Sequence, residues 1–79
     1  MAKKQTWRVV LDGVAHTLTY TRPTFGSCIV FQLDGDRFEL PRGAREEPFR
    51  LGDEQAVLCI HRNGKASVRL RDIVLEESK

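Results

Sequence analysis

This sequence of 79 residues has no long apolar run, only two cysteines and only a small excess of positive charge. Its two cysteines are too few for a disulfide-stapled secreted scaffold, so we expect both to be thiols in a reducing compartment. A folded chain of this size buries only about 60% of the surface that its unfolded form exposes, which leaves little room for a large catalytic cleft. We expect a single domain over residues 5–76, with disordered ends at residues 1–4 and 77–79.

The longest apolar runs, at residues 28–31 and 56–60, are far shorter than the roughly 20 residues of a membrane-spanning helix. Lysines near the N-terminus have no apolar segment behind them, so the pattern of a secretory signal is missing. These absences lead us to expect a cytoplasmic protein that does not contact a membrane. The 13 basic and 11 acidic residues give a net charge of +2, which is low for a nucleic-acid-binding domain.

The sequence does contain a series of short strand-like runs separated by turn residues. These runs are rich in Val, Ile, Thr and Phe, and Gly, Pro and Asn stand between them, which is typical of strands joined by turns. No window of about 11 residues keeps the i, i+3, i+4 apolar spacing of a helix without a breaker. One helical turn at residues 44–47, ending before Pro48, is the exception that we consider. The sequence therefore predicts an all-β domain.

Two Asp-Gly pairs predict hairpins with two-residue loops, because this dipeptide favours the positive φ angles of a type I′ turn. The first pair places Trp7 opposite Leu18, and one face of that hairpin becomes almost wholly apolar. The second pair, Asp34-Gly35, places Phe31 opposite Phe38 in the same way. Loop length alone therefore sorts apolar from polar side chains in both hairpins.

The Asn63-Gly64 pair indicates a longer loop. A two-residue loop here would put Leu58 opposite Arg69 and would mix apolar with polar side chains on each face. A three-residue loop over residues 62–64, with the glycine in the left-handed position of a G1 bulge, puts Leu58 opposite Val68 instead. The outward face of this hairpin then carries Val57, Cys59, His61, Lys65, Ser67, Arg69 and Arg71.

Three hairpins, a short strand at residues 49–51 and a C-terminal strand at residues 73–76 make about seven or eight strands. Each hairpin has one apolar face, and two sheets packed face to face bury such faces together. We therefore predict a small antiparallel β-sandwich built from hairpins. A small β-barrel is the alternative fold.

Residue types of catalytic and metal sites are present but dispersed. Nucleophilic catalysis needs Ser or Cys beside an oriented His, yet His16 belongs to an apolar face, whereas Cys59 and His61 point outward. We interpret His16 as a buried, hydrogen-bonded core residue. The spacing of these residues and Cys28 contains no local pair of metal-binding cysteines. We expect no catalytic residues, no metal site and no cofactor.

The feature that remains is a basic stripe on the outward face of the hairpin at residues 55–71. Its members, which we take as candidate partner-contact residues, are His61, Arg62, Lys65, Arg69 and Arg71. Such a stripe can follow phosphates, but no exposed aromatic residue lies among the arginines to stack on bases. We expect a non-enzymatic domain that binds another protein or self-associates, with a nucleic-acid-binding module as the alternative.

The N-terminal part of the chain also resembles a known family. Residues 7–20, WRVVLDGVAHTLTY, with residues 27–30 and 33–35, resemble the repeated β-sandwich domain of the Fas apoptotic inhibitory molecule family. In that domain a Trp-x-Val strand runs into an Asp-Gly turn and a His-x-hydrophobic strand. The resemblance implies a compact, non-enzymatic antiparallel sandwich that acts through protein contacts and needs no cofactor. The family usually has two such domains, and this chain has the length of one.

Overall fold

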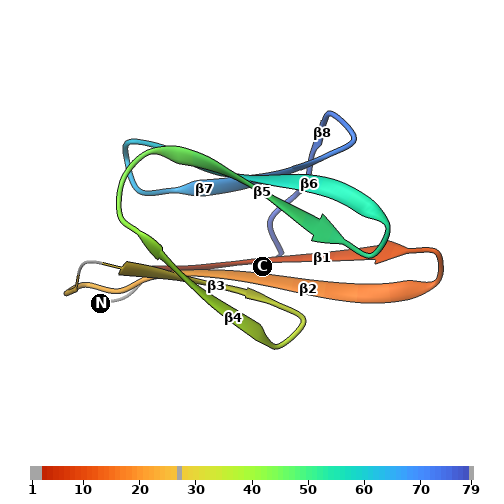
Figure 1. Cartoon of the computed structure of the whole chain (residues 1–79), viewed down its shortest axis with the longest axis horizontal. Coiled ribbons are helices and arrows are strands. Elements are labelled where there is room, and N and C mark those ends of the chain that lie inside the picture. Colours follow the sequence, from red (N-terminus) through yellow and green to blue (C-terminus); the bar gives the residue numbers. More distant parts are fainter. Residues whose placement is uncertain (1–2, 27, 79) are drawn as a thin grey trace. The chain divides into compact units, whose positions relative to one another are not determined.

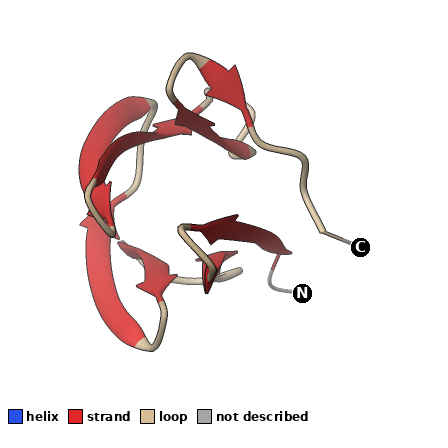
Figure 2. Cartoon of the chain, turned by 90° about the vertical axis from the view of Figure 1, so that its right-hand side faces the viewer, coloured by secondary structure: helices blue, strands red, loops and turns tan. Residues whose placement is uncertain are grey.

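The computed structural model describes residues 3–26 and 28–78 and shows strands and no helix over those residues (Figure 2). The strands form two four-stranded antiparallel sheets, ordered β1-β2-β3-β4 and β5-β6-β7-β8 (Figure 1). Their bounds are β1 Lys3–Leu11, β2 Val14–Arg22, β3 Cys28–Leu33, β4 Asp36–Pro41, β5 Arg45–Leu51, β6 Glu54–Ile60, β7 Ala66–Leu70 and β8 Ile73–Val74. The predicted all-β class is confirmed.

Each sheet belongs to its own compact unit. The first unit runs to Arg42 and includes Glu77 and Ser78, and the second is Gly43–Glu76. No described strand of one sheet pairs with a strand of the other, so the β-barrel alternative is wrong. The two antiparallel four-stranded sheets fit the predicted small β-sandwich.

The first unit consists of the two Asp-Gly hairpins, joined by pairing between β2 and β3. Trp7 pairs with Leu18, and Phe31 pairs with Phe38, as two-residue loops require. The φ angles at residues 34 and 35 are 51° and 97°, which are the two positive values of a type I′ turn. Both predicted hairpins are therefore confirmed.

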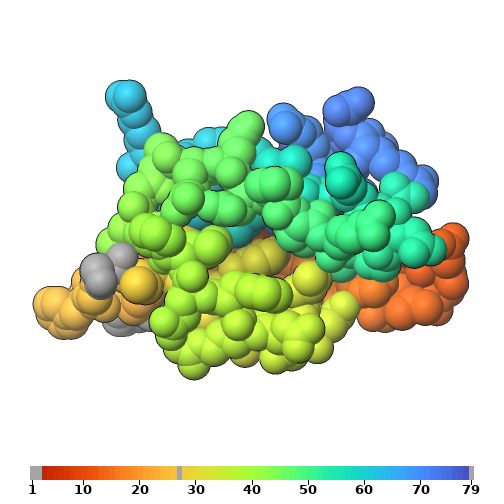
Figure 3. All heavy atoms as spheres, viewed as in Figure 1, coloured from red at the N-terminus to blue at the C-terminus, as the bar shows by residue number. Residues whose placement is uncertain are grey.

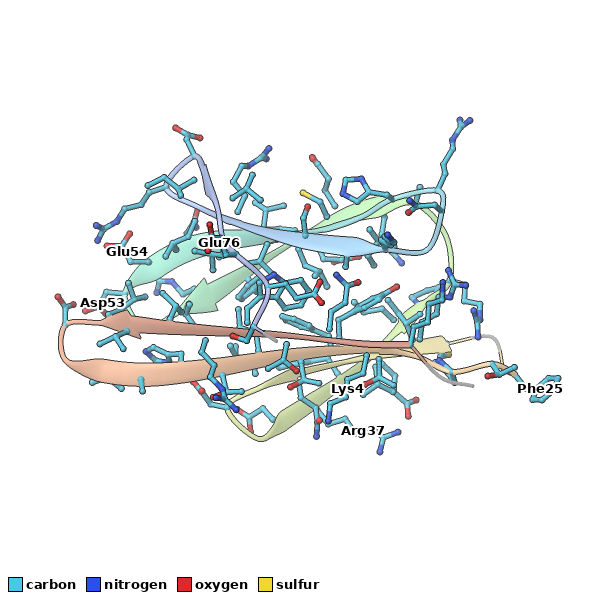
Figure 4. The ribbon with its side chains drawn as sticks, turned by 180° about the vertical axis from the view of Figure 1, so that it is seen from behind. Lys4, Phe25, Arg37, Asp53, Glu54 and Glu76 are labelled. Carbon is cyan, nitrogen blue, oxygen red and sulfur yellow. The ribbon has the colours of Figure 1, made fainter. Side chains whose placement is uncertain are left out.

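A side chain from the end of the first unit holds the connection between β2 and β3. The Arg42 guanidinium donates a hydrogen bond to the carbonyl oxygen of Gly26 at 2.7 Å and another to that of Pro23. Phe25, between these two carbonyls, is 88% exposed and projects away from the ribbon (Figure 4). Polar contacts to the backbone, not burial of the aromatic ring, position residues 23–26 of this connection.

The hairpin of β6 and β7 has the predicted three-residue loop. Leu58 pairs with Val68, and the His61 N–H donates to the Lys65 carbonyl at 2.9 Å. The Gly64 N–H donates back to the His61 carbonyl at 3.0 Å, with φ of 87° at the glycine. This left-handed glycine is the G1-bulge position, and the predicted register is confirmed.

Two expectations about the second unit are wrong. The helical turn considered at residues 44–47 does not form, because β5 starts at Arg45 rather than at the predicted residue 49 and pairs with β6 along its whole length. Pro48 fits there because β5 is an edge strand, whose outer side needs no backbone N–H. The last strand is shorter than the predicted 73–76, because β8 covers only Ile73–Val74.

The two chain ends that we expected to be disordered include described residues with backbone partners. Lys3 lies in β1, and the Ser78 N–H donates to the Thr6 carbonyl at 2.6 Å. Residues 1–2 and 79 lie outside the described residues. Backbone pairing therefore includes Lys3, Lys4 and Ser78, which lie outside the range 5–76.

Each sheet buries the side chains of one face, as strand alternation requires. The buried apolar residues of the first sheet are Trp7, Leu18, Tyr20, Ile29 and Phe31, and those of the second are Leu51, Ala56, Leu58, Ile60, Ala66, Val68 and Leu70. Among the described residues, no polar or charged residue is buried. The charged side chains of the described residues are therefore all at least partly accessible to solvent, whereas Tyr20 is 1% exposed and burial raises the pKa of its hydroxyl group.

Candidate functional site

The candidate site is the outward face of the β5–β8 sheet. Leu58 and Val68 are buried, so the side chains next to them in β6 and β7 point the other way. The five predicted contact residues are all exposed there or in the adjoining turns, and we call them the basic face: His61, Arg62, Lys65, Arg69 and Arg71. The hairpin tip that carries Arg62 projects from the molecular surface (Figure 3).

His61 is positioned by a neighbouring hydroxyl group. Its Nε2 lies 3.2 Å from the Ser67 Oγ, and Ser67 pairs across the strands with Cys59, a half-buried free thiol. Within the described part of the chain no carboxylate hydrogen-bonds to His61, so the arrangement lacks the acid that orients the histidine of a nucleophilic triad. The contact instead holds the imidazole on the surface of the sheet.

Arg71 occupies a turn, although the sequence analysis placed it on a strand. Arg71 and Asp72 form the two-residue loop between β7 and β8, with φ of 51° and 63°. The guanidinium of Arg71 donates a hydrogen bond to Glu54, and this bond lowers the pKa of the Glu54 carboxyl. Two non-glycine residues in the left-handed region are uncommon, and the sequence contains no Asn or Gly here to indicate the turn.

Side chains of β5, β6 and β8 form an apolar strip on this face, with Arg69 of β7 between them. Pro48, Val57, Arg69 and Val74 form one row of the register, from β5 to β8. A shallow open pocket at this row is lined by Pro48, Gln55, Ala56, Val57, Arg69, Arg71 and Asp72. Val74 is 62% exposed at the end of the row. Pro48 and Val74 were not predicted as part of this face, because only the pairing of β5 with β6 and of β8 with β7 brings them there.

A second polar cluster lies in the first unit, where β2 meets the turn before β4. His16 Nδ1 is 2.6 Å from the Asp34 Oδ2, and the Thr17 N–H donates to the Asp34 Oδ1 at 2.7 Å. The His16 hydrogen bond, followed by the Thr17 backbone bond, lowers the pKa of the Asp34 carboxyl. The predicted hydrogen bonding of His16 is confirmed, but its predicted burial is wrong, because the side chain is 12% exposed at the margin of the core. Asp34, which was expected only to shape its turn, also joins β2 to that turn.

Replacing Asp34 with asparagine is expected to lower the free energy of unfolding by about 1 kcal/mol or less at neutral pH. Asparagine tolerates the positive φ of 51°, so the substitution removes the charge without straining the turn. The 40% exposure of the carboxylate keeps the expected effect small, because solvent screens the ion pair.

The pH dependence of this difference has a defined sign. The folded-state pKa of Asp34 lies below its unfolded value, so its stabilising contribution is complete above about pH 4 and is lost as the pH falls through the folded-state pKa. Urea unfolding of the unchanged chain and of the Asp34→Asn variant, between neutral and acidic pH, measures this difference in stability. The stability gap should close in acid, whereas a gap that stays constant would show that charge plays no part.

The residues that could hold a metal ion do not meet in the described ranges, 3–26 and 28–78. No group of three or more His, Cys, Asp or Glu side chains lies close enough together there to hold an ion. Cys28 is exposed in the first unit, and Cys59 belongs to the second. A search of the same residues for a helix able to cross a membrane also finds none.

Comparison with family models, with curated proteins and with solved structures finds no match for this chain. The resemblance to the Fas apoptotic inhibitory molecule family therefore stays a prediction. Of the residues that suggest it, Trp7 is 1% exposed and His16 is hydrogen-bonded to Asp34, so both have structural roles in the first unit.

Proposed function

We propose that the second unit is a non-enzymatic binding module whose basic face contacts an acidic segment of another protein. The observation that carries the proposal is the position of exposed cations beside exposed aliphatic surface. Arg69 stands in the same cross-strand row as Val57 and Val74. Arginine next to apolar area is typical of the central part of protein–protein interfaces. A segment with both carboxylates and aliphatic side chains complements both parts of this surface.

The cations of the basic face differ in how free they are to bind a partner. Arg71 already donates a hydrogen bond to Glu54. Among the described residues, Lys65 and Arg69 form no salt bridge, and both are exposed. A new carboxylate partner for these two therefore breaks no existing ion pair, and we assign them the main electrostatic role.

The alternative is that the same cations bind the phosphates of a nucleic acid. The exposed Arg62 at the hairpin tip and Lys65 beside it favour this alternative, because a row of cations can track a phosphate backbone. The outward face, however, has Pro48, Val57 and Val74 where a single-strand binder has stacking aromatic rings. This aliphatic strip is the reason that we favour a protein partner.

Charge reversal at two positions tests the proposal. The Lys65→Glu/Arg69→Glu double variant should bind a labelled synthetic peptide of alternating Glu and Leu about 10-fold more weakly than the unchanged chain, because two charge pairs become repulsive. Fluorescence anisotropy measures the affinity, and labelled single-stranded and duplex oligonucleotides serve as second probes at two salt concentrations.

The matched control is the Lys4→Glu/Arg8→Glu double variant in β1, which makes the same change in net charge at exposed positions of the other unit. Peptide affinity should survive in this control. Equal affinities in both double variants would remove the basic face from consideration. Oligonucleotide binding that falls steeply with salt, without peptide binding, would favour the nucleic-acid alternative.

A further inference from the structure

Strand β4 is an open edge of the first sheet. It is the last strand in the order β1-β2-β3-β4, and no described strand pairs with its outer side (Figure 1). Five of its six residues are exposed, and its yellow-green atoms form part of the molecular surface in Figure 3. An open edge of this kind is a template for pairing with another strand.

The other described sheet edges are protected. Ser78 forms a bridge with Thr6 in the middle of β1, and Pro48 interrupts the donors along the outer side of β5. The edge strand β8 has only two residues. Such short strands, prolines and covering segments are the usual means of preventing edge pairing. Residues 36–40 of β4 have none of them.

The turn before β4 determines which of its backbone groups face outward. A type I′ turn joins Leu33 and Asp36 as a hydrogen-bonded pair, and such pairs then alternate with non-hydrogen-bonded pairs along the ladder. Arg37 and Glu39 consequently direct their N–H and C=O groups away from β3. Pro41 has the same orientation but no N–H, so it marks the end of the open stretch.

Opposite charges on either side of Phe38 select one register for two copies of this strand. In an antiparallel pair of two copies, the residues whose backbone N–H and C=O groups face outward must lie opposite one another. The two-fold axis can therefore pass through residue 37, 38 or 39. An axis at residue 37 places Arg37 opposite the partner's Arg37, and an axis at residue 39 places Glu39 opposite the partner's Glu39. Like charges directly opposite each other are destabilising. Only the axis at Phe38 sets Arg37 opposite the partner's Glu39.

The side chains needed for this register are exposed within the single chain. Arg37 Nη2 and Glu39 Oε1 lie 3.3 Å apart, with 60% and 61% of the side chains exposed, and Arg37 extends away from the ribbon (Figure 4). A second pair of opposite charges can therefore join them without displacing packed groups. Phe38 is 47% exposed at the centre of the strand.

We propose that two copies of this chain associate by antiparallel pairing of β4 with β4, about a two-fold axis at Phe38. The axis falls on a non-hydrogen-bonded pair, where opposite Cα atoms are about 4.5 Å apart and side chains are closest, so Phe38 meets the partner's Phe38. Aromatic cross-strand pairs stabilise antiparallel strands, and main-chain hydrogen bonds from Arg37 and Glu39 supply the rest. The dimer buries the Phe38 ring of each copy and gives hydrogen-bond partners to the outward-facing backbone groups of β4. It leaves the basic face in the other unit unchanged.

A charge-swap experiment on the full chain tests the dimer and its register. Sedimentation equilibrium of the unchanged chain should show a reversible monomer–dimer equilibrium. Arg37→Glu and Glu39→Arg each place two like-charge pairs across the axis and should weaken self-association about 10-fold. In an equimolar mixture of the two variants, each acidic strand faces a basic strand, so association should return to the level of the unchanged chain. Lys65→Glu, on the basic face, is the control and should leave self-association unaltered.

Recovery in the mixture supports the proposal in a way that misfolding of either variant cannot imitate, because a misfolded chain gains nothing from a second variant. The proposal is overturned by an unchanged chain that stays monomeric up to about 1 mM. It is equally overturned by single variants that associate as well as the unchanged chain, or by a mixture that associates no better than each variant alone.

Discussion

Replacing Trp7 with alanine is expected to lower the free energy of unfolding by about 3–5 kcal/mol. Trp7 is 1% exposed, is the largest fully buried side chain of the first sheet, and pairs with the fully buried Leu18. Truncation loses the transfer free energy of the indole ring and leaves a cavity in the core. A domain of this size has a total stability of only a few kcal/mol. The variant should therefore be largely unfolded at room temperature.

Urea titration followed by far-UV circular dichroism measures this loss, since the variant has no tryptophan fluorescence. Val10→Ala is the matched control, because Val10 lies on the same strand but is 66% exposed on the opposite face. Its expected effect is within about 0.5 kcal/mol. Similar losses at both positions would contradict the assignment of the two faces of β1.

Replacing Leu58 with alanine is expected to lower the free energy of unfolding by about 2–5 kcal/mol. Leu58 is 0% exposed at the centre of the second sheet and pairs with Val68, which is equally buried. The neighbouring Val57 is only half-buried on the outward face, so Val57→Ala should cost clearly less. Differential scanning calorimetry of both variants gives the comparison. A larger loss for Val57→Ala would mean that the two faces of β6 are exchanged.

Local turn chemistry is what made much of the fold predictable from the sequence. Asp34-Gly35 can adopt the two positive φ angles of a type I′ turn at little cost, and loop length then sets every pair of the hairpin. Gly64 likewise adopts the positive φ angle that the longer loop between β6 and β7 requires. These decisions involve neighbouring residues only, so the hairpin registers could be derived without any knowledge of the rest of the molecule.

Elements that depend on distant partners could not be derived in this way. The Arg45–Glu47 part of β5 has weak strand propensity and precedes a proline, and its extended form comes from pairing with β6. Arg71 and Asp72 form a type I′ turn without glycine, because the pairing of Leu70 with Ile73 closes the loop around them. Strand propensity is context-dependent, and here tertiary pairing decides the outcome.

The candidate site was predictable to a similar extent. The alternation along β6 and β7 was sufficient to place Lys65 and Arg69 together on one exposed face. The apolar row through Pro48 and Val74 needed the pairing of the two outer strands, whose partners and register could not be derived from the sequence. The contact between His16 and Asp34 needed the pairing of β2 with β3, for which the sequence offers no short turn.

The register of β6 against β7 is the central claim, because it decides that Lys65 and Arg69 face outward. Nuclear Overhauser effects between Hα protons test it directly, since opposite Hα protons approach closely only in non-hydrogen-bonded pairs. The His61–Lys65 hydrogen bond makes Leu58 and Val68 such a pair, and a strong effect between their Hα protons is predicted. A strong effect between Cys59 and Val68 in its place would indicate the two-residue loop and would contradict the account.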